Sequence, residues 1–396
     1  MLLWGGQVVS TLGSSASNVI YPLLILAITD SPAAAGIGAA LAHVPYLLFS
    51  LPAGALIDRW DRKRVMILCD AGRALTVASI AAALWLDVLS VGQMYAAAFI
   101  EGSFFVFFNI AEVAALPRVV AKDQLPQAAA QNEAAFAAAY IVGPSFGTLL
   151  YQGLGRAAPF VADAISYVVS IASLALIRTP FRVAPAGTAR SLRAEIAEGM
   201  RWLWQQRLIR YMAFLTGNIN LVNAGTGLIV IVLAQQMGAR PVEIGLVFSI
   251  GGVGGMLGAL VGGQVQKRFS FGQAIIVLTW LNALLFPLYA LAPAYILLGV
   301  VSALLYFLGP VYNVVQFSYR LALIPDALQG RVNSTFRLLA FGLMPIGAAL
   351  TGFLLERLGA GATVALFTLW LALLAIMTTL NRHVREARPL RELAAV

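Results

Sequence analysis

Residues 33–56 read AAAGIGAALAHVPYLLFSLPAGAL, contain no charged side chain, and end at the short charged run 57–64, IDRWDRKR. A second largely apolar stretch, 65–87, follows directly. A helix needs about twenty mainly apolar residues to cross a bilayer. Each stretch is therefore long enough to cross, whereas the charged run is long enough only for a tight loop. The pattern predicts a helical hairpin that spans a membrane.

The same alternation of long apolar stretches and short polar breaks continues along the whole chain. It predicts an all-α membrane protein with twelve transmembrane helices. Their expected spans are 4–29, 33–56, 65–87, 91–115, 132–154, 158–179, 209–235, 242–265, 270–290, 294–316, 334–356 and 361–381.

Composition supports this class. The chain has 396 residues, of which 60% are hydrophobic and 11% charged, and its mean hydropathy is +0.86. A soluble chain carries about 25% charged residues, so the apolar excess here must face lipid. Cys69 is the single cysteine, which excludes an internal disulfide. The sequence has no GxxxxGK[ST] motif, no metal-ligand cluster and no nucleophile with a partnering base. We expect neither an enzyme nor a bound cofactor or metal.

The basic residues indicate orientation. With the N-terminus in the cytosol, 22 of the 26 lie in cytosolic loops or the tail, three lie outside, and Arg73 is embedded. This asymmetry follows the positive-inside rule. It accounts for the net charge of +9 without nucleic acid as a partner, and it predicts a bacterial inner membrane protein with both termini in the cytosol.

The longest polar interval divides the predicted helices six and six. We expect an N-terminal bundle at 1–180, a cytosolic linker at 181–208, a C-terminal bundle at 209–381 and a tail at 382–396. The part of the linker from Leu192 to Trp204 has an amphipathic pattern that suits a membrane surface.

The two halves repeat one another. Gly54-Ala55-Leu56-Ile57 recurs as Gly258-Ala259-Leu260-Val261, at an offset of 204 residues, and Pro144 matches Pro345 at an offset of 201. Alternating-access carriers are built from such repeats, because two similar halves can rock about a central site. The repeat favours a carrier over a channel.

The loop at 54–64 resembles the loop motif of the major facilitator superfamily, and the resemblance extends over essentially the whole chain. Asp61 stands where that family usually has glycine, as in the drug-exporting branch that includes macrolide efflux pumps and the enterobactin exporter. Residues 107–117 and 163–167 also look like that branch. The resemblance implies the major facilitator fold, with two pseudo-symmetric six-helix bundles.

A second motif, Gly143-Pro144-Ser145-Phe146-Gly147, resembles the antiporter motif that is associated with export. The match is incomplete, because Ala139 and Thr148 stand where the fuller pattern has glycines. The resemblance therefore favours export without fixing the direction.

In the loop motif, which includes Gly54, Asp58, Arg59, Arg62 and Lys63, we expect a conformational latch. The carboxylate of Asp58 can accept hydrogen bonds from the N-terminus of a helix in the other half, where a negative charge is favoured. The alternative is that the basic residues only anchor the topology.

Ionisable residues inside membrane helices are costly, so each needs a reason. Glu101 lies near the middle of the stretch 91–115 among phenylalanines, where a carboxyl group can cycle between its neutral and charged forms. We expect it to couple transport to protons; the alternative is a polar contact between helices. One proton that moves down about 100 mV supplies about 2.3 kcal/mol.

Asp70 and Arg73 are three residues apart and can pair on one helix face. We expect an embedded ion pair with a structural role. Glu112, Glu133 and Asp163 lie near predicted helix ends, where contact with headgroups is the simpler explanation.

Amide side chains at membrane depth either join helices or line an aqueous cavity, and the sequence leaves both open. The candidates are Asn18, Asn109, Asn220, Asn223, Asn313 and Gln316.

Together these features predict a proton-coupled exporter of hydrophobic or amphipathic small molecules, such as a drug, a macrolide or a siderophore. Its partners would be the substrate, protons and membrane lipids, and it would work as a monomer. The alternatives are a lipid or lysolipid flippase on the same fold and a membrane sensor or scaffold that does not transport.

Overall fold

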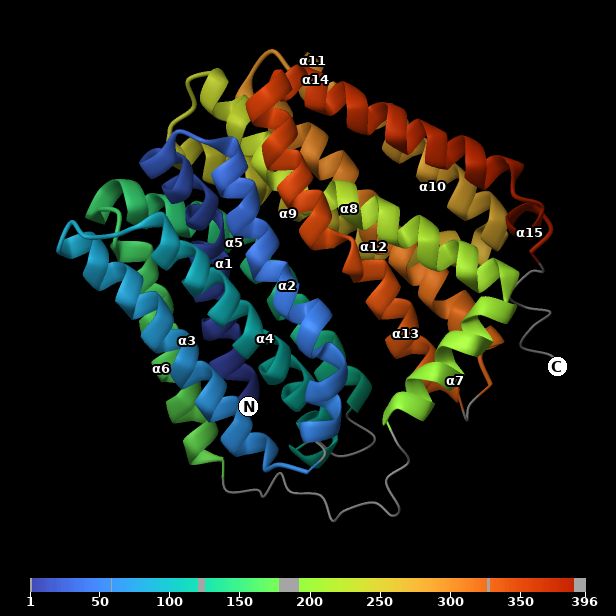
Figure 1. The fold of residues 1–396 in the computed structure, drawn as a ribbon, viewed down its shortest axis with the longest axis horizontal. Coiled ribbons are helices and arrows are strands. Elements are labelled where there is room, and N and C mark those ends of the chain that lie inside the picture. Colours follow the sequence, from blue (N-terminus) through green and yellow to red (C-terminus); the bar gives the residue numbers. More distant parts are fainter. Residues whose placement is uncertain (1, 58, 120–124, 178–191, 326–327, 388–396) are drawn as a thin grey trace. The chain divides into compact units, whose positions relative to one another are not determined.

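A computed structural model describes residues 2–57, 59–119, 125–177, 192–325 and 328–387, and these residues are helical almost throughout, with no strand among them (Figure 1). The helices of the N-terminal half are α1 (Leu2–Thr29), α2 (Pro32–Ile57), α3 (Arg62–Trp85), α4 (Val91–Val119), α5 (Leu125–Leu154) and α6 (Ala158–Leu176). Those of the C-terminal half are α7 (Leu192–Gln205), α8 (Arg207–Gln236), α9 (Pro241–Arg268), α10 (Phe271–Leu285), α11 (Leu288–Leu291), α12 (Tyr295–Leu323), α13 (Gln329–Gly342), α14 (Met344–Leu380) and α15 (Arg382–Arg385).

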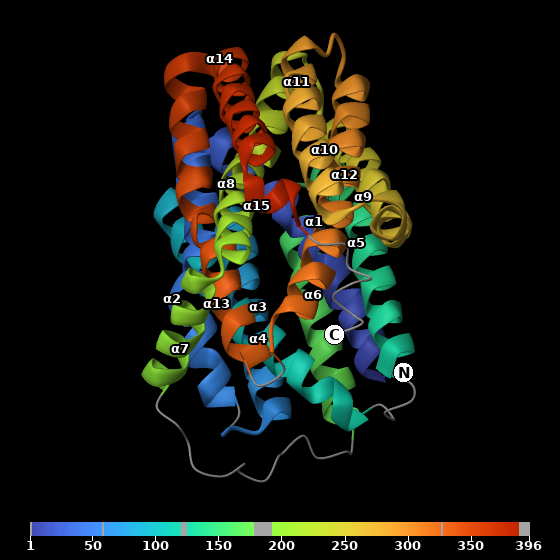
Figure 2. The same cartoon turned by 90° about the vertical axis from the view of Figure 1, so that its right-hand side faces the viewer.

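The chain forms two compact units. The first comprises Met1–Ala189 with Ala239–Ser249, and the second comprises Arg190–Gly238 with Ile250–Val396. In the first, α1 packs against α5 and α6, and α3 packs against α4 and α6. In the second, α14 packs against α8 and α10, and α10 also packs against α12. Figure 2 shows these helices of the second unit, in green, orange and red, running close to parallel.

Eleven helical segments among the described residues are long and apolar enough to cross a membrane. The last of them, Gln329–Leu380, has 52 residues and would be about 78 Å long if straight. It is interrupted at Gly359, where φ is 79° and ψ is 172°, a conformation that only glycine adopts without strain. Figure 1 shows the two arms of α14, in red, running in opposite directions. This segment therefore supplies the last two crossings, and the predicted twelve-helix fold is confirmed.

Each unit contains a close approach between its first and fifth long helices. In the first unit, a Cβ added at Gly147 of α5 would overlap the backbone oxygen of Ala16 in α1. In the second, a Cβ added at Gly347 of α14 would overlap the backbone oxygen of Leu221 in α8. Small residues allow membrane helices to pack backbone against backbone. The two halves therefore share this helix packing as well as the sequence repeat.

The amphipathic stretch before the C-terminal bundle is helical and forms α7. It packs against α13, and the Arg331 guanidinium forms an ion pair with Glu198 at 2.6 Å. A Cβ added at Gly199 would lie 2.6 Å from the backbone oxygen of Arg331, so α7 and α13 are in close contact.

Candidate functional site

The first unit contains a cluster of ionisable side chains in its interior, which we call the charged centre: Tyr21, Arg73, Glu101, Asp163 and Tyr167. Glu101 comes from the middle of α4, and the Tyr21 hydroxyl of α1 donates a hydrogen bond to its carboxylate at 2.5 Å. The Glu101 side chain is only partly buried. The hydrogen bond to Tyr21 holds the carboxylate in a defined position, and the side chain is not completely enclosed by the bundle.

Asp163 of α6 is the second acid of the charged centre and is completely buried. It accepts hydrogen bonds from the hydroxyls of Ser17 at 2.5 Å, Ser166 at 3.3 Å and Ser14 at 3.4 Å. Gly13 allows this contact, because a Cβ there would lie 2.9 Å from a carboxylate oxygen of Asp163. The prediction that Asp163 contacts headgroups was wrong, because α6 turns this side chain toward α1.

Glu112 of α4 is also buried, with 5% of its surface exposed. The prediction of headgroup contact was therefore wrong for this acid too, because α4 turns it toward the interior of the bundle. The side chain of Glu133, for which the same contact was predicted, lies outside the described residues.

Arg73 of α3 supplies the positive charge of the charged centre. Its guanidinium donates a hydrogen bond to the Ser14 hydroxyl at 3.3 Å. It also lies over the ring of Tyr167, 4.3 Å from the centroid, and near that of Phe105 at 5.7 Å. A cation over an aromatic face is stabilised more strongly when both are desolvated.

Asp70 and Arg73 do not form the expected hydrogen-bonded ion pair. Both carboxylate oxygens of Asp70 and the Nε of Arg73 are buried without a hydrogen-bond partner, although the two charges still interact. The spacing of three residues allows the pair, but the guanidinium turns instead toward Ser14 and Tyr167.

The charged centre combines two carboxyl groups with one arginine. Their interaction extends across it, because the charge of Arg73 acts on both Glu101 and Asp163 and the two acids act on each other. With both acids ionised, the set carries one uncompensated negative charge in a medium where such charge is costly. A single bound proton makes the set neutral. This arrangement suits reversible proton binding.

The basic residues of the loop motif bind the ends of two helices. Arg62 donates to the backbone oxygen of Ala114 near the end of α4 at 2.7 Å. Lys63 donates to the backbone oxygens of Ala175 at 3.1 Å and Ile177 at 2.7 Å, where α6 ends. Cations are favoured at helix C-termini, where backbone oxygens lack intrahelical partners.

The other residues of the loop motif include Gly54, Asp58, Arg59 and Asp61. Arg59 is exposed, and a Cβ at Gly54 would meet nothing within 4 Å. The expected latch residue, Asp58, lies outside the described residues. Asp61 accepts a hydrogen bond from the backbone N–H of Arg64 at 3.2 Å and so caps α3.

The antiporter-like motif is the part of α5 that touches α1. A Cβ at Gly143 would overlap the Cβ of Ser15, and Pro144 lies within the helix. The backbone oxygen of Pro144 accepts a hydrogen bond from Thr148 at 2.9 Å. Thr148, where the fuller motif has glycine, thus fits without disturbing the contact.

Gly147→Ala is expected to lower the stability of the folded protein by about 1–3 kcal/mol, because its Cβ would overlap the backbone of α1. Gly153→Ala in the same helix is the matched control, since a Cβ there would meet nothing within 4 Å. Thermal unfolding of both purified variants in detergent measures the difference. Equal unfolding temperatures would contradict the close packing of α1 and α5.

The amide side chains fall into two groups. Asn18, Asn223 and Asn313 are exposed near the middle of α1, α8 and α12, and Asn109 is partly buried. Asn220 instead joins two helices by donating to the backbone oxygen of Ala340 at 2.8 Å. Gln316 is buried, and its Nε2 has no partner.

The expected span 294–316 leaves Arg320 in the loop that follows it, but Arg320 lies in the last turn of α12 and is 5% exposed. Its guanidinium lies 3.9 Å from the centroid of the Phe336 ring of α13. Length of an apolar stretch alone did not indicate that α12 continues past residue 316.

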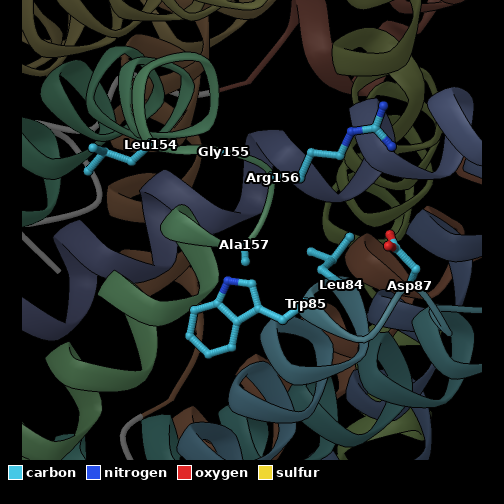
Figure 3. Close-up of a pocket in the computed structure, with 7 residues that line it drawn as sticks. All are labelled: Leu84, Trp85, Asp87, Leu154, Gly155, Arg156 and Ala157. Carbon is cyan, nitrogen blue, oxygen red and sulfur yellow. The ribbon is translucent and has the colours of Figure 1, made fainter.

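A pocket lies at the end of the first unit where α3 and α5 end, and it is lined by Leu84, Trp85, Asp87, Leu154, Gly155, Arg156 and Ala157 (Figure 3). The seven residues belong to two turns and the helix ends beside them. The residues of the charged centre do not line it.

Comparisons with known proteins agree with the fold. The family model described as Major Facilitator Superfamily matches residues 3–309. The chain is 28% identical over 390 residues to the multidrug efflux pump Tap of Mycolicibacterium fortuitum, covering 94% of this chain and 93% of that protein. It is 26% identical over 402 residues to macrolide efflux protein A of Streptococcus pyogenes, covering 97% and 96%. Against the enterobactin exporter EntS of Escherichia coli O9:H4 (strain HS), it is 25% identical over 377 residues, covering 94% and 90%.

Solved structures show the same fold at low sequence identity. A crystal structure of the nucleoside transporter NupG aligns with a TM-score of 0.75 at 14% identity, covering 98% of this chain and 100% of that one. A bacterial homologue of the iron transporter ferroportin, in an inward-facing state, aligns with a TM-score of 0.72 at 15% identity, covering 96% and 98%. The resemblance inferred from the loop motif is confirmed.

Proposed function

The chain belongs to the Major Facilitator Superfamily, and on that premise we propose that it is a secondary transporter that exports hydrophobic or amphipathic small molecules in exchange for protons. The relatives that it matches over nearly their whole length are named as pumps or exporters of drugs, macrolides and enterobactin. These names support export and suggest the class of substrate.

The charged centre is the observation that carries proton coupling. Glu101 and Asp163 share one buried cation, Arg73, so the set is one negative charge in excess until a proton binds. Glu101 is partly exposed whereas Asp163 is completely buried, so we expect a proton to reach Glu101 before Asp163. Protonation would remove the uncompensated charge and so favour a different arrangement of the helices around it.

The exposed amides support a polar substrate path. Asn18, Asn223 and Asn313 lie near the middle of their helices, where lipid contact would leave their polar groups without partners. We infer that they face water and substrate rather than hydrocarbon. Asn18 and Asn223 belong to the first long helix of each unit, as expected for a path formed by two repeats.

The proposed transporter also has a defined orientation, domain motion and oligomeric state. The excess of basic residues in one set of loops supports cytosolic termini in a bacterial inner membrane. The bundles at 1–180 and 209–381 would rock to alternate access, with Asp58 as a latch. One chain would suffice for transport, as a monomer among membrane lipids.

Inside-out membrane vesicles that contain the protein provide the test. We expect ethidium, the macrolide erythromycin or enterobactin to accumulate when the vesicle interior is acidified, and the accumulation to collapse when a protonophore removes the gradient. Phospholipid movement without uptake of any of the three probes would support the flippase alternative instead. Absence of both would overturn the proposed function.

A further inference from the structure

The interface between α1 and α6 is lined with polar side chains along its length. On α1 these are Gln7, Ser10, Ser14 and Ser17, and on α6 they are Asp163, Ser166, Ser170 and Ser173. We call these eight residues the polar seam. Each set recurs every three or four residues, so each forms one stripe on its helix. From first to last, each stripe rises about 15 Å, roughly half the thickness of the hydrocarbon core.

Glycines on α1 bring the two stripes into contact. A Cβ at Gly6 would overlap the hydroxyl oxygen of Ser173, and a Cβ at Gly13 would overlap that of Ser166. At both positions the backbone of α1 therefore lies directly against serine hydroxyl groups of α6. Such a contact can serve helix packing alone. Any further role of the polar seam depends on the chemical groups at its two ends.

One end of the polar seam is the charged centre. Ser17 and Ser166 donate hydrogen bonds to Asp163. The Ser14 hydroxyl is 2.8 Å from that of Tyr167, and Arg73 and Glu101 lie beyond it. A proton bound at Glu101 or Asp163 therefore has hydroxyl groups beside it.

The other end of the polar seam is a buried site that lacks partners. The Ser170 hydroxyl faces the Asp70 carboxylate of α3, yet it and both carboxylate oxygens have no hydrogen bond of normal length. The Nε2 of Gln7 and the Oε1 of Glu112 are also unpartnered. All four side chains are less than 9% exposed. Buried polar groups of this kind normally have a partner, so these side chains have hydrogen-bonding capacity that the protein itself does not use.

Glu112 connects this site to the loop end of the unit. It lies on α4, close enough to Asp70 for the two charges to interact. It is two residues before Ala114, whose backbone oxygen binds Arg62 of the charged loop. The charged groups that face Asp70 are Arg73 on its own helix and Glu112 on α4. Acids and hydroxyls thus follow one another from mid-bundle to the loop end.

We propose that the polar seam, with Asp70 and Glu112, is a proton path through the interior of the first unit, between the charged centre and the cytosolic loop end. During export, a proton on Glu101 or Asp163 passes along the serine hydroxyls and bound water to Asp70, then to Glu112, and then to cytosolic water. Each group accepts one proton from one neighbour and gives one to the next, so the path ends unchanged. The inference rests on the proposed proton coupling and assigns the route that it uses.

The test uses purified protein in proteoliposomes, with erythromycin as the probe substrate and a pH indicator inside. Glu112→Gln, Asp70→Asn and Ser170→Ala are expected to slow erythromycin-coupled proton movement by roughly a hundredfold, as when a proton-transfer group is lost. They should leave exchange of labelled for unlabelled erythromycin within about twofold, because exchange needs no net proton release. Glu112→Asp should restore most of the proton movement.

Ser103→Ala is the matched control, since the Ser103 hydroxyl bonds within α4 to the backbone oxygen of Phe99 at 2.7 Å and lies outside the seam. A coupled wild type with unchanged proton movement in the three variants would overturn the path while leaving the proposed function intact. Equal loss of exchange would also overturn it, because the residues would then serve folding or substrate binding. A wild type without coupled proton movement would overturn the path and the proposed coupling together.

Discussion

Glu101→Gln is expected to abolish substrate accumulation driven by a pH gradient while leaving substrate exchange in place. One proton that moves down about 100 mV supplies about 2.3 kcal/mol, enough for a gradient of roughly fifty-fold. Glutamine keeps the size of the side chain and can still bond to Tyr21, but it cannot bind and release a proton. Accumulation in proteoliposomes should therefore fall to the level of simple equilibration.

Glu386→Gln is the matched control, because this acid directly follows α15, is exposed, and forms an ion pair with Arg382, which is exposed too. It should accumulate substrate like the wild type. If Glu101→Gln still accumulates substrate in response to the pH gradient, the coupling residue lies elsewhere. Asp163, which shares the same arginine, would then be the next acid to replace.

Arg73→Met is expected to destabilise the protein by about 3–5 kcal/mol, the usual cost of leaving buried charges unpaired. Arg73 is the only basic side chain below 9% exposure in the described part of the first unit. Methionine fills similar space but leaves Glu101, Asp163 and Asp70 without a nearby cation. Thermal unfolding in detergent at neutral pH measures the loss.

A second substitution distinguishes charge from packing. If the loss comes from uncompensated negative charge, Arg73→Met combined with Asp163→Asn should recover much of the stability. Arg156→Met is the control, because Arg156 is exposed in the turn before α6. No recovery in the double variant would mean that Arg73 stabilises the bundle mainly through its contacts with Tyr167 and Phe105.

The membrane spans could be predicted from the sequence because crossing a bilayer imposes one requirement, a long apolar helix, that a sequence displays directly. The ends of the helices were harder to predict. The helix α12 continues to Leu323, beyond the apolar stretch, and the ring of Phe336 in α13 covers the guanidinium of Arg320. The break at Gly359 was predictable as a gap between two spans, although its left-handed φ was not.

The charged centre was predicted only in part. Glu101 was identified because an acid in mid-helix stands out, but distance from a helix end does not tell whether Asp163 faces lipid headgroups or another helix. Asp70 and Arg73 have the spacing of a pair, yet spacing permits a contact without requiring it. The signal that could have located Asp163 is the stripe that it shares with Ser166 and Ser170, since a polar stripe in a membrane helix must face protein or water.

The two units differ in the buried charges that they carry. The described part of the first unit buries three acids and one base, whereas that of the second buries Arg320 and no acid. Similar halves have thus diverged in chemistry while keeping the close helix packing at Gly147 and Gly347. Proton binding is therefore expected to depend on the first unit.

Substrate-driven proton movement tests the central claim most directly. Proteoliposomes that contain the wild-type protein, loaded with erythromycin and a pH indicator, are diluted into substrate-free buffer at the same pH and without a membrane potential. The account predicts that outward flow of erythromycin draws protons inward, so that the interior acidifies, and that Glu101→Gln abolishes this change. Outward flow of erythromycin with no change in internal pH, or with alkalinisation of the interior, would contradict it.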